Sequence, residues 1–207
     1  MTLAAETIQQ DNSKQPAIRE RAVMMLDGGI ETEIISFDNL CDAREHVALF
    51  FQTRQPGTRP LVRIHSECLT GDAFGSAQCD CGDQLREAKE KISAEGGVLL
   101  YLRQEGRGIG LYNKISTYKA QREQGLDTFA ANRHLGFEDD ERSFRVAAEM
   151  LTALGMNRIR LLTNNPDKIS QLTQYGIAID EVIPTGRYEK EANRHYLQTK
   201  RDKGHTV

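Results

Sequence analysis

The regular alternation of apolar runs and amphipathic segments after Gly82 is the feature that most constrains the fold of this chain. Strands are predicted there at 97–102, 158–162 and 177–183. Helices are predicted between and after them at 83–95, 109–124, 140–154, 166–175 and 189–203. Because helices that connect strands pack on the faces of a sheet, this order is typical of α/β proteins. We therefore predict an α/β fold, with a mixed β-sheet covered by helices.

The chain before Gly82 adds strands and turns to this sheet. Its apolar runs predict strands at 22–26, 31–37, 46–51 and 61–65. Gly28-Gly29 is a suitable turn between the first two. Residues 1–18 are polar and rich in Gln, Asn and Ser, which indicates a flexible tail. No repeat or long linker is visible, so residues 19–207 are expected to form a single domain.

Composition excludes several classes of partner. The formal net charge is −3, so bulk charge favours no nucleic-acid partner. No apolar run approaches the roughly 20 residues of a membrane span, and no secretory signal is visible. We therefore expect no membrane partner and a cytoplasmic location, where cysteines stay reduced or bind metal.

Three cysteines, Cys68, Cys79 and Cys81, are the strongest chemical signal. Three thiolates are a soft ligand set that suits zinc and leaves one tetrahedral position open for water. Bound zinc lowers the pKa of water to roughly 7, so the trio indicates hydrolysis. Unrelated thiols or a redox pair are the alternatives from spacing alone. Cys41 lies far along the chain and is expected to be a bystander.

Glycine-rich and polar segments follow two of the later strands. Arg103-Gln-Glu-Gly-Arg-Gly-Ile-Gly-Leu-Tyr-Asn-Lys114 joins a strand to a helix, and its glycines allow backbone N–H groups to approach an anion. Arg107 is a candidate phosphate donor and Glu105 a candidate acceptor for a base or ribose. Leu161-Leu-Thr-Asn-Asn-Pro-Asp-Lys168 has the same strand-to-helix setting. An ordinary glycine turn and an ordinary helix start are the alternatives.

The segment between them is acidic. Asp139 or Asp140 is predicted to cap the helix at 140–154, which places Arg142 in the first turn against the helix dipole. A cation at that place indicates an anionic ligand. Ligands of α/β sheets bind at the carboxyl ends of the strands, so we expect the cysteine and the two strand-end segments to converge there.

Together these motifs resemble GTP cyclohydrolase II, an enzyme family of riboflavin synthesis. The matching runs are Arg63-Ile-His-Ser-Glu-Cys-Leu-Thr-Gly-Asp, Cys79-Asp-Cys-Gly, Arg103-Gln-Glu-Gly-Arg-Gly-Ile-Gly-Leu, Asp127-Thr, Leu135-Gly-Phe and Leu161-Leu-Thr-Asn-Asn-Pro. They extend over roughly 46–205. No dihydroxybutanone-phosphate synthase domain precedes them, so the resemblance implies the standalone form.

The resemblance implies a role for each matching residue. Cys68, Cys79 and Cys81 would bind one catalytic Zn²⁺ per subunit, and Mg²⁺ would accompany the triphosphate. Asp140 would be the proton acceptor, Arg142 the nucleophile, and Tyr118 a catalytic residue near the base. The GTP site would be formed by Arg63, Ile64, His65, Ser66, Glu67, Gln84, Glu105, Gly106, Arg107, Thr128, Thr163 and Lys168. A homodimer is also expected.

The implied reaction opens the guanine imidazole ring at C8 and releases formate and pyrophosphate. Its product is 2,5-diamino-6-ribosylamino-4(3H)-pyrimidinone 5′-phosphate. Tyr118 stands where a methionine is associated with stopping after ring opening, so its presence favours the complete reaction. Arg142 is an awkward nucleophile because a protonated guanidinium has no free lone pair, and a phosphate clamp is the simpler role. A homologue serving another GTP-derived pathway, and a non-enzymatic zinc or nucleotide-binding module, are the other interpretations.

Overall fold

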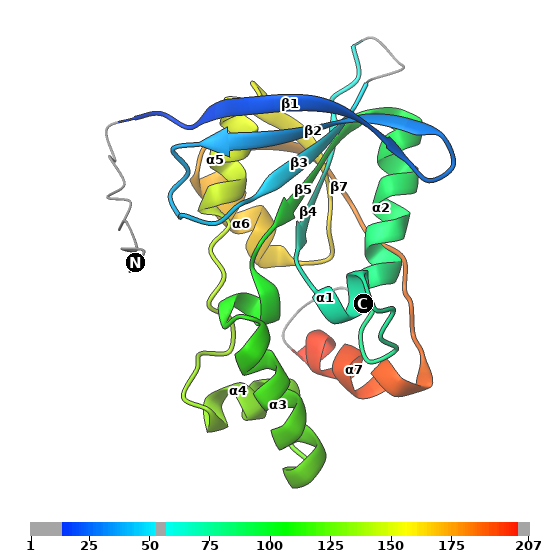
Figure 1. Ribbon diagram of the computed structural model, residues 1–207, viewed down its shortest axis with the longest axis vertical. Helices are drawn as coiled ribbons and strands as arrows, with labels where there is room; N and C mark the ends of the chain where they lie inside the picture. The colour runs from blue at the N-terminus through cyan, green and yellow to red at the C-terminus, as the bar shows by residue number, and fades with distance from the viewer. Residues whose placement is uncertain (1–13, 53–56, 203–207) are drawn as a thin grey trace, which may run out of the picture.

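The computed structural model describes residues 14–52 and 57–202, which are built around one seven-stranded mixed sheet (Figure 1). The strand order is β1-β2-β3-β5-β4-β6-β7. The first four strands in this order pair antiparallel, and β5, β4, β6 and β7 pair parallel. The strands span Ala17–Leu26, Ile30–Asp38, Val47–Phe51, Leu61–Ser66, Gly97–Leu102, Arg158–Leu162 and Ala178–Ile183, for β1 to β7 respectively. The predicted α/β class is confirmed.

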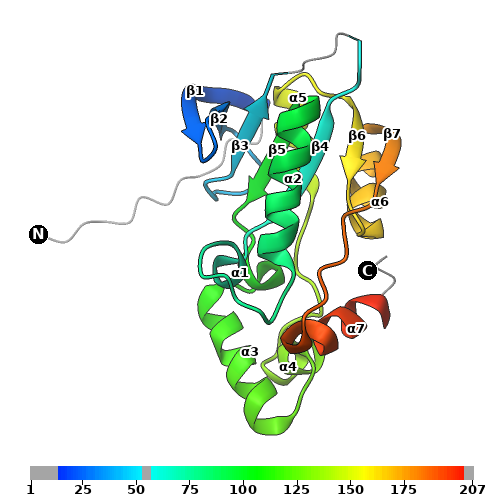
Figure 2. The same ribbon diagram turned by 90° about the vertical axis from the view of Figure 1, so that its right-hand side faces the viewer.

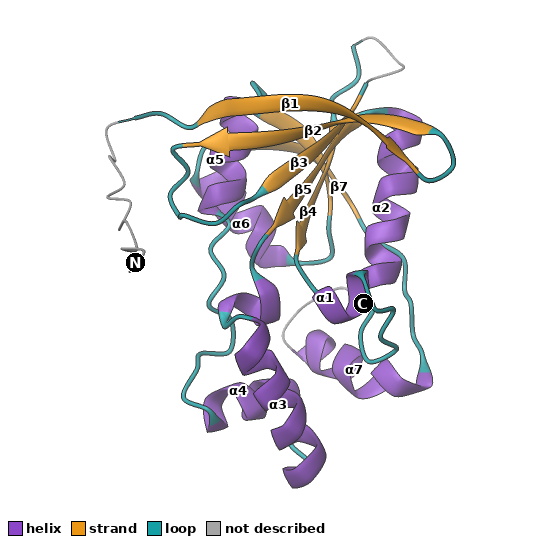
Figure 3. Ribbon diagram, viewed as in Figure 1, coloured by secondary structure: helices purple, strands orange, loops and turns teal. Residues whose placement is uncertain are grey.

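Helices cover the two faces of this sheet. Helices α5 (Arg145–Ala153) and α6 (Pro166–Gln174) lie on one face, and α2 (Cys81–Glu95) lies on the other, as Figure 3 shows. The larger apolar cluster combines α5 and α6 with residues such as Val62 and Val98. The smaller cluster combines α2 residues Ala88 and Ile92 with Leu61 and Leu99. Burial of these side chains supplies the main stabilisation of the fold.

Side-chain alternation along β4 explains how polar residues reach the α2 face. Val62 and Ile64 point into the larger cluster, and Leu61 points to the α2 side. Because successive side chains in a strand point to opposite faces, Arg63 and His65 share the α2 side with Leu61. This strand therefore brings two buried basic side chains toward the start of α2.

The remaining helices lie beyond the carboxyl ends of β4, β5 and β6 (Figures 1 and 2). Two of them are single turns: α1 (Leu69–Asp72) and the 3₁₀ helix Glu105–Gly108. Helices α3 (Leu111–Gln124) and α4 (Thr128–His134) follow. The described chain ends with the 3₁₀ helix Glu191–Asn193 and α7 (Arg194–Asp202). The α3–α4 pair and α7 stand on either side of the strand ends. The strand ends and these helices enclose the space in which the predicted motifs meet.

Most predicted elements are present, and the main error lies between α4 and α5. The helix predicted at 140–154 begins only at Arg145, with Phe144 as its N-cap residue. Neither Asp139 nor Asp140 is its cap, and Arg142 lies in a loop instead of the first helical turn. The amide N–H of Phe144 donates to the Gln171 side chain of α6, so a tertiary contact determines where the helix begins.

Several other boundaries differ from expectation: β1 begins at Ala17 instead of residue 22, and the last helix begins at Arg194 instead of residue 189. Helices α1 and α4 were not predicted. The predicted tail 1–18 falls largely outside the described residues, but Ala17 and Ile18 belong to β1. Within the described part of the chain, no helix combines the length and apolarity needed to cross a membrane.

Candidate active site

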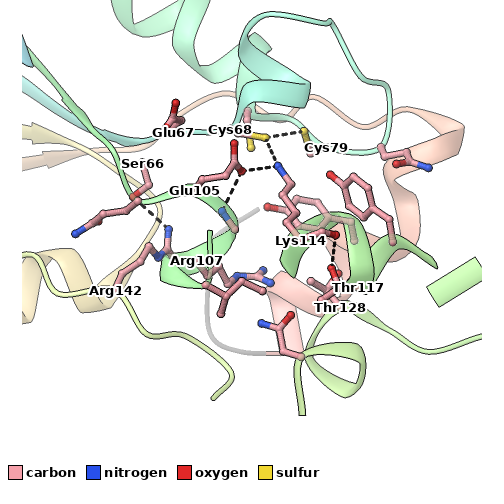
Figure 4. Close-up of a pocket in the computed structure, with 18 of the residues that line it drawn as sticks. Ser66, Glu67, Cys68, Cys79, Glu105, Arg107, Lys114, Thr117, Thr128 and Arg142 are labelled. Carbon is pink, nitrogen blue, oxygen red and sulfur yellow. Dashed lines mark hydrogen bonds and ion pairs between the residues drawn. The ribbon is translucent and has the colours of Figure 1, made fainter. Parts of the chain in front are cut away.

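A cavity of about 1100 Å³ opens at the carboxyl ends of β4, β5 and β6. Its wall contains the three cysteines, the glycine-rich turn, one side of α3 and the start of α6. Figure 4 shows its central side chains. The predicted convergence of separate motifs at this edge of the sheet is therefore confirmed.

The three cysteine sulfurs form a compact cluster in the cavity wall. Cys68 precedes α1, Cys79 lies in the following loop, and Cys81 begins α2. All three sulfurs lie within 4.8 Å of one another, and Cys68 Sγ is 3.7 Å from Cys79 Sγ. Two thiolates that bind one zinc ion tetrahedrally at about 2.3 Å stand about 3.8 Å apart. The donor set and its spacing therefore fit a zinc ion.

Two glycines make this close approach possible. A Cβ atom on Gly71 would lie 2.8 Å from Cys79 Sγ and 3.2 Å from Cys68 Sγ. A Cβ atom on Gly82 would lie only 2.3 Å from the carbonyl oxygen of Gly71. A side chain at Gly82 would therefore force α1 and α2 apart, and a side chain at Gly71 would displace the cysteine sulfurs.

Without a metal ion, the three cysteines differ in how readily they lose their protons. Hydrogen bonds from Cys79 and Cys81, with the Lys114 ammonium nearby, lower the pKa of the Cys68 thiol. The same contact with Cys68 raises the pKa of Cys79 to about 11 and raises that of Cys81 well above its ordinary value. Three thiolates together therefore require a cation, as expected of a metal site.

A buried ion pair joins the cysteines to the glycine-rich turn. Lys114 Nζ on α3 donates to Glu105 Oε1 at 2.7 Å and to Cys68 Sγ at 3.2 Å. Glu105 also accepts from the amide N–H groups of Leu69 at 2.6 Å and Gly106 at 2.9 Å. The Glu105 carboxylate is therefore held by contacts inside the protein.

Asp72, at the end of α1, is a second organising carboxylate. It accepts from the Tyr101 hydroxyl at 2.8 Å and from the amide N–H of Cys68 at 3.0 Å. His65 Nε2 lies 3.0 Å from both Asp72 oxygens, and its ring stacks on Tyr101. Burial lowers the pKa of His65 despite this carboxylate. Asp72 thus fixes the loop that carries Cys68.

Basic side chains at the strand ends make fixed contacts. Arg63 donates to the Leu162 carbonyl at 3.1 Å and to Gln84 Oε1 at 2.7 Å. Lys168 donates to the Ile64 carbonyl at 2.8 Å. The Thr163 hydroxyl accepts from the Asn165 amide at 3.1 Å. These contacts pre-orient the strand-end groups along one wall.

Arg142 and Asp140 form a two-pronged ion pair in the loop before α5. Arg142 Nε and the Nη2 nitrogen donate to the two Asp140 oxygens at 2.8 and 2.5 Å. A third nitrogen lies 3.4 Å from Ser66 Oγ. Burial alone would lower the pKa of Arg142, but the hydrogen bond and charge of Asp140 raise it above its ordinary value. The guanidinium therefore stays protonated.

The α3–α4 side contributes aromatic and hydroxyl groups. The Tyr118 hydroxyl lies 3.2 Å from Thr70 Oγ1, and burial raises its pKa. Arg107 has a left-handed backbone (φ 59°), and its guanidinium lies 4.4 Å from the centre of the Phe129 ring. Thr128 is the first residue of α4. The Asp127 side chain caps this helix by accepting from the amide N–H groups of Phe129 and Ala130.

Nearly all predicted site residues lie in the cavity wall. They are Arg63, His65, Ser66, Glu67, Cys68, Cys79, Cys81, Gln84, Glu105, Gly106, Arg107, Tyr118, Thr128, Arg142, Thr163 and Lys168. Ile64 differs because its side chain is fully buried in the larger apolar cluster, so only its backbone faces this region. Asp140 touches the site through Arg142.

Lys114, Asp72 and Tyr196 were not assigned a role from the sequence. Lys114 and Tyr196 line the cavity, and the Arg107 guanidinium lies 5.7 Å from the Tyr196 ring. Lys114 and Asp72 stand inside motifs that sequence analysis singled out, but a lysine or aspartate there carries no distinct signal by itself. Tyr196 comes from α7, remote in sequence from every motif.

The fold and cavity define an α/β protein with a cluster of three cysteines in the wall of a large ligand cavity. Residues 19–184 match the family model described as GTP cyclohydrolase II, a longer match at the N-terminus than the motifs alone indicate. A GTP cyclohydrolase-2 from Aliivibrio fischeri is 51% identical over 193 residues, covering 92% of this chain and 96% of the relative. This chain therefore belongs to the GTP cyclohydrolase II family of enzymes.

Two further relatives are similar in sequence over most of this chain. A GTP cyclohydrolase-2 from Vibrio parahaemolyticus is 56% identical over 172 residues, with 83% of this chain and 86% of the relative covered. The riboflavin biosynthesis protein RibBA of Bacillus subtilis is 53% identical over 178 residues, covering 84% of this chain and 44% of that protein. A solved two-domain 3,4-dihydroxy-2-butanone 4-phosphate synthase from A. baumannii gives a TM-score of 0.46 at 14% identity, covering 84% of this chain and 41% of that one.

Proposed function

We propose that this protein hydrolyses GTP to 2,5-diamino-6-ribosylamino-4(3H)-pyrimidinone 5′-phosphate, formate and pyrophosphate, in the first step of riboflavin synthesis. One water opens the C8–N9 bond and leaves a formyl group on N7. A second water cleaves that formamide and releases formate. A third water cleaves the bond between the α- and β-phosphates. GTP and these three waters together contain all the atoms of the three products.

The observation that carries this proposal is the meeting of the three sulfurs with strand-end cations in one cavity. Zinc bound by Cys68, Cys79 and Cys81 would supply water of lowered pKa at neutral pH. The cavity volume of about 1100 Å³ is at the upper end of the range for small-molecule sites, which suits a nucleoside triphosphate. Mg²⁺ is proposed to accompany the triphosphate as its counter-ion.

We assign different residues of the chain to different parts of the substrate. The family likeness implies that the wall formed by Arg63 to Glu67, Gln84, Glu105 to Arg107 and Thr128 lines the GTP site. Within it we assign Glu105 to the base or ribose, and the glycine-rich turn with Arg107 to the phosphates. The phosphates are also assigned to the α6 side, where Thr163 and Lys168 stand at a helix start. Tyr118 faces Thr70 beside the sulfurs and is assigned the transfer of protons during ring opening.

Arg142 is assigned a phosphate clamp. Its guanidinium is protonated and paired with Asp140, and a protonated guanidinium donates hydrogen bonds but has no lone pair for attack. Asp140 then orients Arg142. Single-turnover reactions with labelled GTP separate the roles: a clamp leaves no nucleotide bound covalently to the wild type. A covalent adduct on the wild type that is lost in Arg142→Ala would establish attack.

The test of the proposed function is GTP turnover by the purified protein with zinc and Mg²⁺ under reducing conditions. We expect formate and pyrophosphate in equal amounts from the wild type. Cys79→Ser is expected to lose turnover by at least about 100-fold. Cys41→Ser, outside the sulfur cluster, is the matched control and should retain turnover.

The products distinguish the alternative functions. Pyrophosphate without formate would indicate an enzyme that stops at the formamide. Bound zinc without any GTP turnover would indicate a binding module and contradict the proposal. By the same family likeness we propose a homodimer in the cytoplasm, which sedimentation analysis and cell fractionation would check.

A further inference from the structure

Lys114 occupies a central position between three parts of the site. It lies in the first turn of α3 and is 9% exposed. Its ammonium has three N–H donors and three acceptors within reach. These acceptors are Glu105 Oε1 at 2.7 Å, Thr70 Oγ1 at 3.1 Å and Cys68 Sγ at 3.2 Å. All its hydrogen-bonding capacity is therefore directed at the sulfur cluster and its surroundings (Figure 4).

Glu105 holds this ammonium in place. Its carboxylate is itself fixed by the amide groups of Leu69 and Gly106. The Lys114 side chain therefore cannot turn toward solvent without leaving a buried carboxylate without its counter-charge, which is costly. The ion pair aims one N–H at the Cys68 sulfur.

The charge of the metal-loaded sulfur cluster explains why a cation beside Cys68 would be favourable. Three thiolates around one divalent cation carry a net charge of −1, in a wall where two of the three cysteines are buried. A cation at hydrogen-bond distance from one sulfur offsets that charge and withdraws electron density from the sulfur. Groups that hydrogen-bond to metal ligands tune the metal in this way.

We propose that Lys114 is a positioning residue of the metal centre, which donates to the Cys68 thiolate and thereby strengthens metal binding. This inference rests on the proposed function only in that Cys68, Cys79 and Cys81 bind a metal. The same ammonium contacts Thr70, which contacts the Tyr118 hydroxyl. Lys114 thus links the metal ligand to the proposed proton-transfer group.

A purely structural role for the ion pair makes a different prediction. If Lys114 and Glu105 served only to fasten α3 to the glycine-rich turn, loss of either charge would disturb the site equally. If Lys114 acts on the thiolate, the loss of Lys114 weakens metal binding more than the loss of the Glu105 charge. Glu105→Gln can keep an oxygen that accepts from Lys114, although its NH2 group then replaces the oxygen that accepts from the Leu69 amide.

The experiment measures zinc affinity by chelator competition on the purified full chain without GTP. Lys114→Met is expected to weaken zinc binding by about 10- to 100-fold. Glu105→Gln is expected to lose clearly less zinc affinity than Lys114→Met, because it keeps an oxygen facing Lys114. Lys89→Met, on α2 outside the cavity wall, is the matched control and should bind zinc like the wild type.

The cobalt-substituted protein supplies a spectroscopic readout. Loss of the N–H donor makes the Cys68 sulfur richer in electrons, so the thiolate-to-cobalt band of Lys114→Met should move to longer wavelength. Glu105→Gln should leave the band close to its wild-type position. If Lys114→Met does not fold, Lys114→Gln replaces it, since its amide can donate but carries no charge; its zinc affinity should still fall.

Two results would overturn the inference. Equal zinc affinity and an unshifted cobalt band in the Lys114 variant would show that the contact has no effect on the metal. An equal loss of zinc in the Lys114 and Glu105 variants would show a fastening role alone. Because these titrations need no GTP, they are separate from turnover: wild-type protein that binds zinc without hydrolysing GTP would contradict the proposed function and leave this inference intact.

Discussion

At the scale of single residues, the sulfur cluster depends on the absence of one side chain. Gly71 lies where a Cβ atom would enter the space between Cys68 and Cys79. Its backbone is outside the left-handed region, so alanine is compatible with its φ angle. A substitution there therefore isolates the effect of one methyl group on the metal ligands.

We predict that Gly71→Ala weakens zinc binding by at least about 10-fold, because the methyl group displaces Cys79 Sγ from the common centre. Metal analysis after dialysis against a defined free zinc concentration measures this. Gly186→Ala adds a methyl group against the Tyr188 side chain, away from the sulfurs, and should keep its zinc. Full zinc occupancy in Gly71→Ala would contradict the packing argument.

The Asp140–Arg142 pair should make stability depend on pH. Burial of Asp140 opposes its ionisation, but the hydrogen bonds from Arg142 hold its pKa below the ordinary value. A carboxyl group with a lowered folded-state pKa stabilises the protein above its unfolded pKa, and this contribution is lost as the pH falls through the folded value.

Asp140→Asn is therefore expected to lower the free energy of unfolding by about 1 kcal/mol at pH 7. The difference from wild type should begin to shrink as the pH falls below about 4, where the carboxyl group of the unfolded chain is protonated, and should vanish below the lower folded-state pKa. Urea unfolding midpoints at a series of pH values test this. A difference that stays constant down to the lowest pH at which both proteins fold would rule out the pair as its source.

At the scale of elements, α4 shows how a short helix supports the site. Asp127 Oδ1 accepts from the amides of Phe129 and Ala130, each at 2.8 Å, which satisfies free N–H groups at the helix start. Phe129 in turn lies against the Arg107 guanidinium. The cap therefore supports one wall of the cavity.

Asp127→Ala should cost about 1 kcal/mol of stability through loss of the cap. It should also raise the KM for GTP, because Thr128 and Arg107 lose their support. Chemical unfolding and steady-state kinetics measure the two effects. Asp127→Asn keeps an oxygen that can cap the helix, so its stability and its KM should stay close to those of the wild type. An equal KM for the wild type and both variants would show that α4 does not support the GTP site.

The elements also show where local pattern is a sufficient guide. Strands β5 and β6 begin and end at the predicted residues, because their apolar runs are bounded by glycine and polar residues. The apolar spacing of Ala147, Ala148 and Leu151 correctly predicted α5. Its start was wrong by five residues because Gln171 of another helix takes the amide of Phe144. Helix α4 is only seven residues long, so its sequence shows no helical repeat of apolar residues from which it could be predicted.

At the scale of the whole molecule, the three-cysteine cluster proposed to bind metal is separate from the apolar core. The two apolar clusters lie along the sheet, and the sulfurs lie beyond its strand ends. The fold should therefore survive metal removal, unlike small domains that fold only around zinc. A bound metal nevertheless stabilises the folded state in proportion to its occupancy.

Zinc at 100 times its dissociation constant should stabilise the protein by about 2.7 kcal/mol. This corresponds to a rise of about 5–10 °C in Tm for a chain of this size. Thermal unfolding with zinc and with chelator measures the shift, and far-ultraviolet circular dichroism should show a folded protein in both. Complete unfolding on chelation would contradict the independence of the core.

Local sequence was enough to single out the three cysteines and the strand-end motifs, because thiol chemistry, glycine turns and hydrophobic period are properties of short segments. It did not reveal that Lys114 reaches Cys68, 46 residues earlier, or that Asp72 gathers His65 and Tyr101. Those partnerships depend on parallel β4 and β5 ending side by side, which brings distant segments together. Burial then forces each charged group to find a partner there, so tertiary structure decided which residues contact the cysteines.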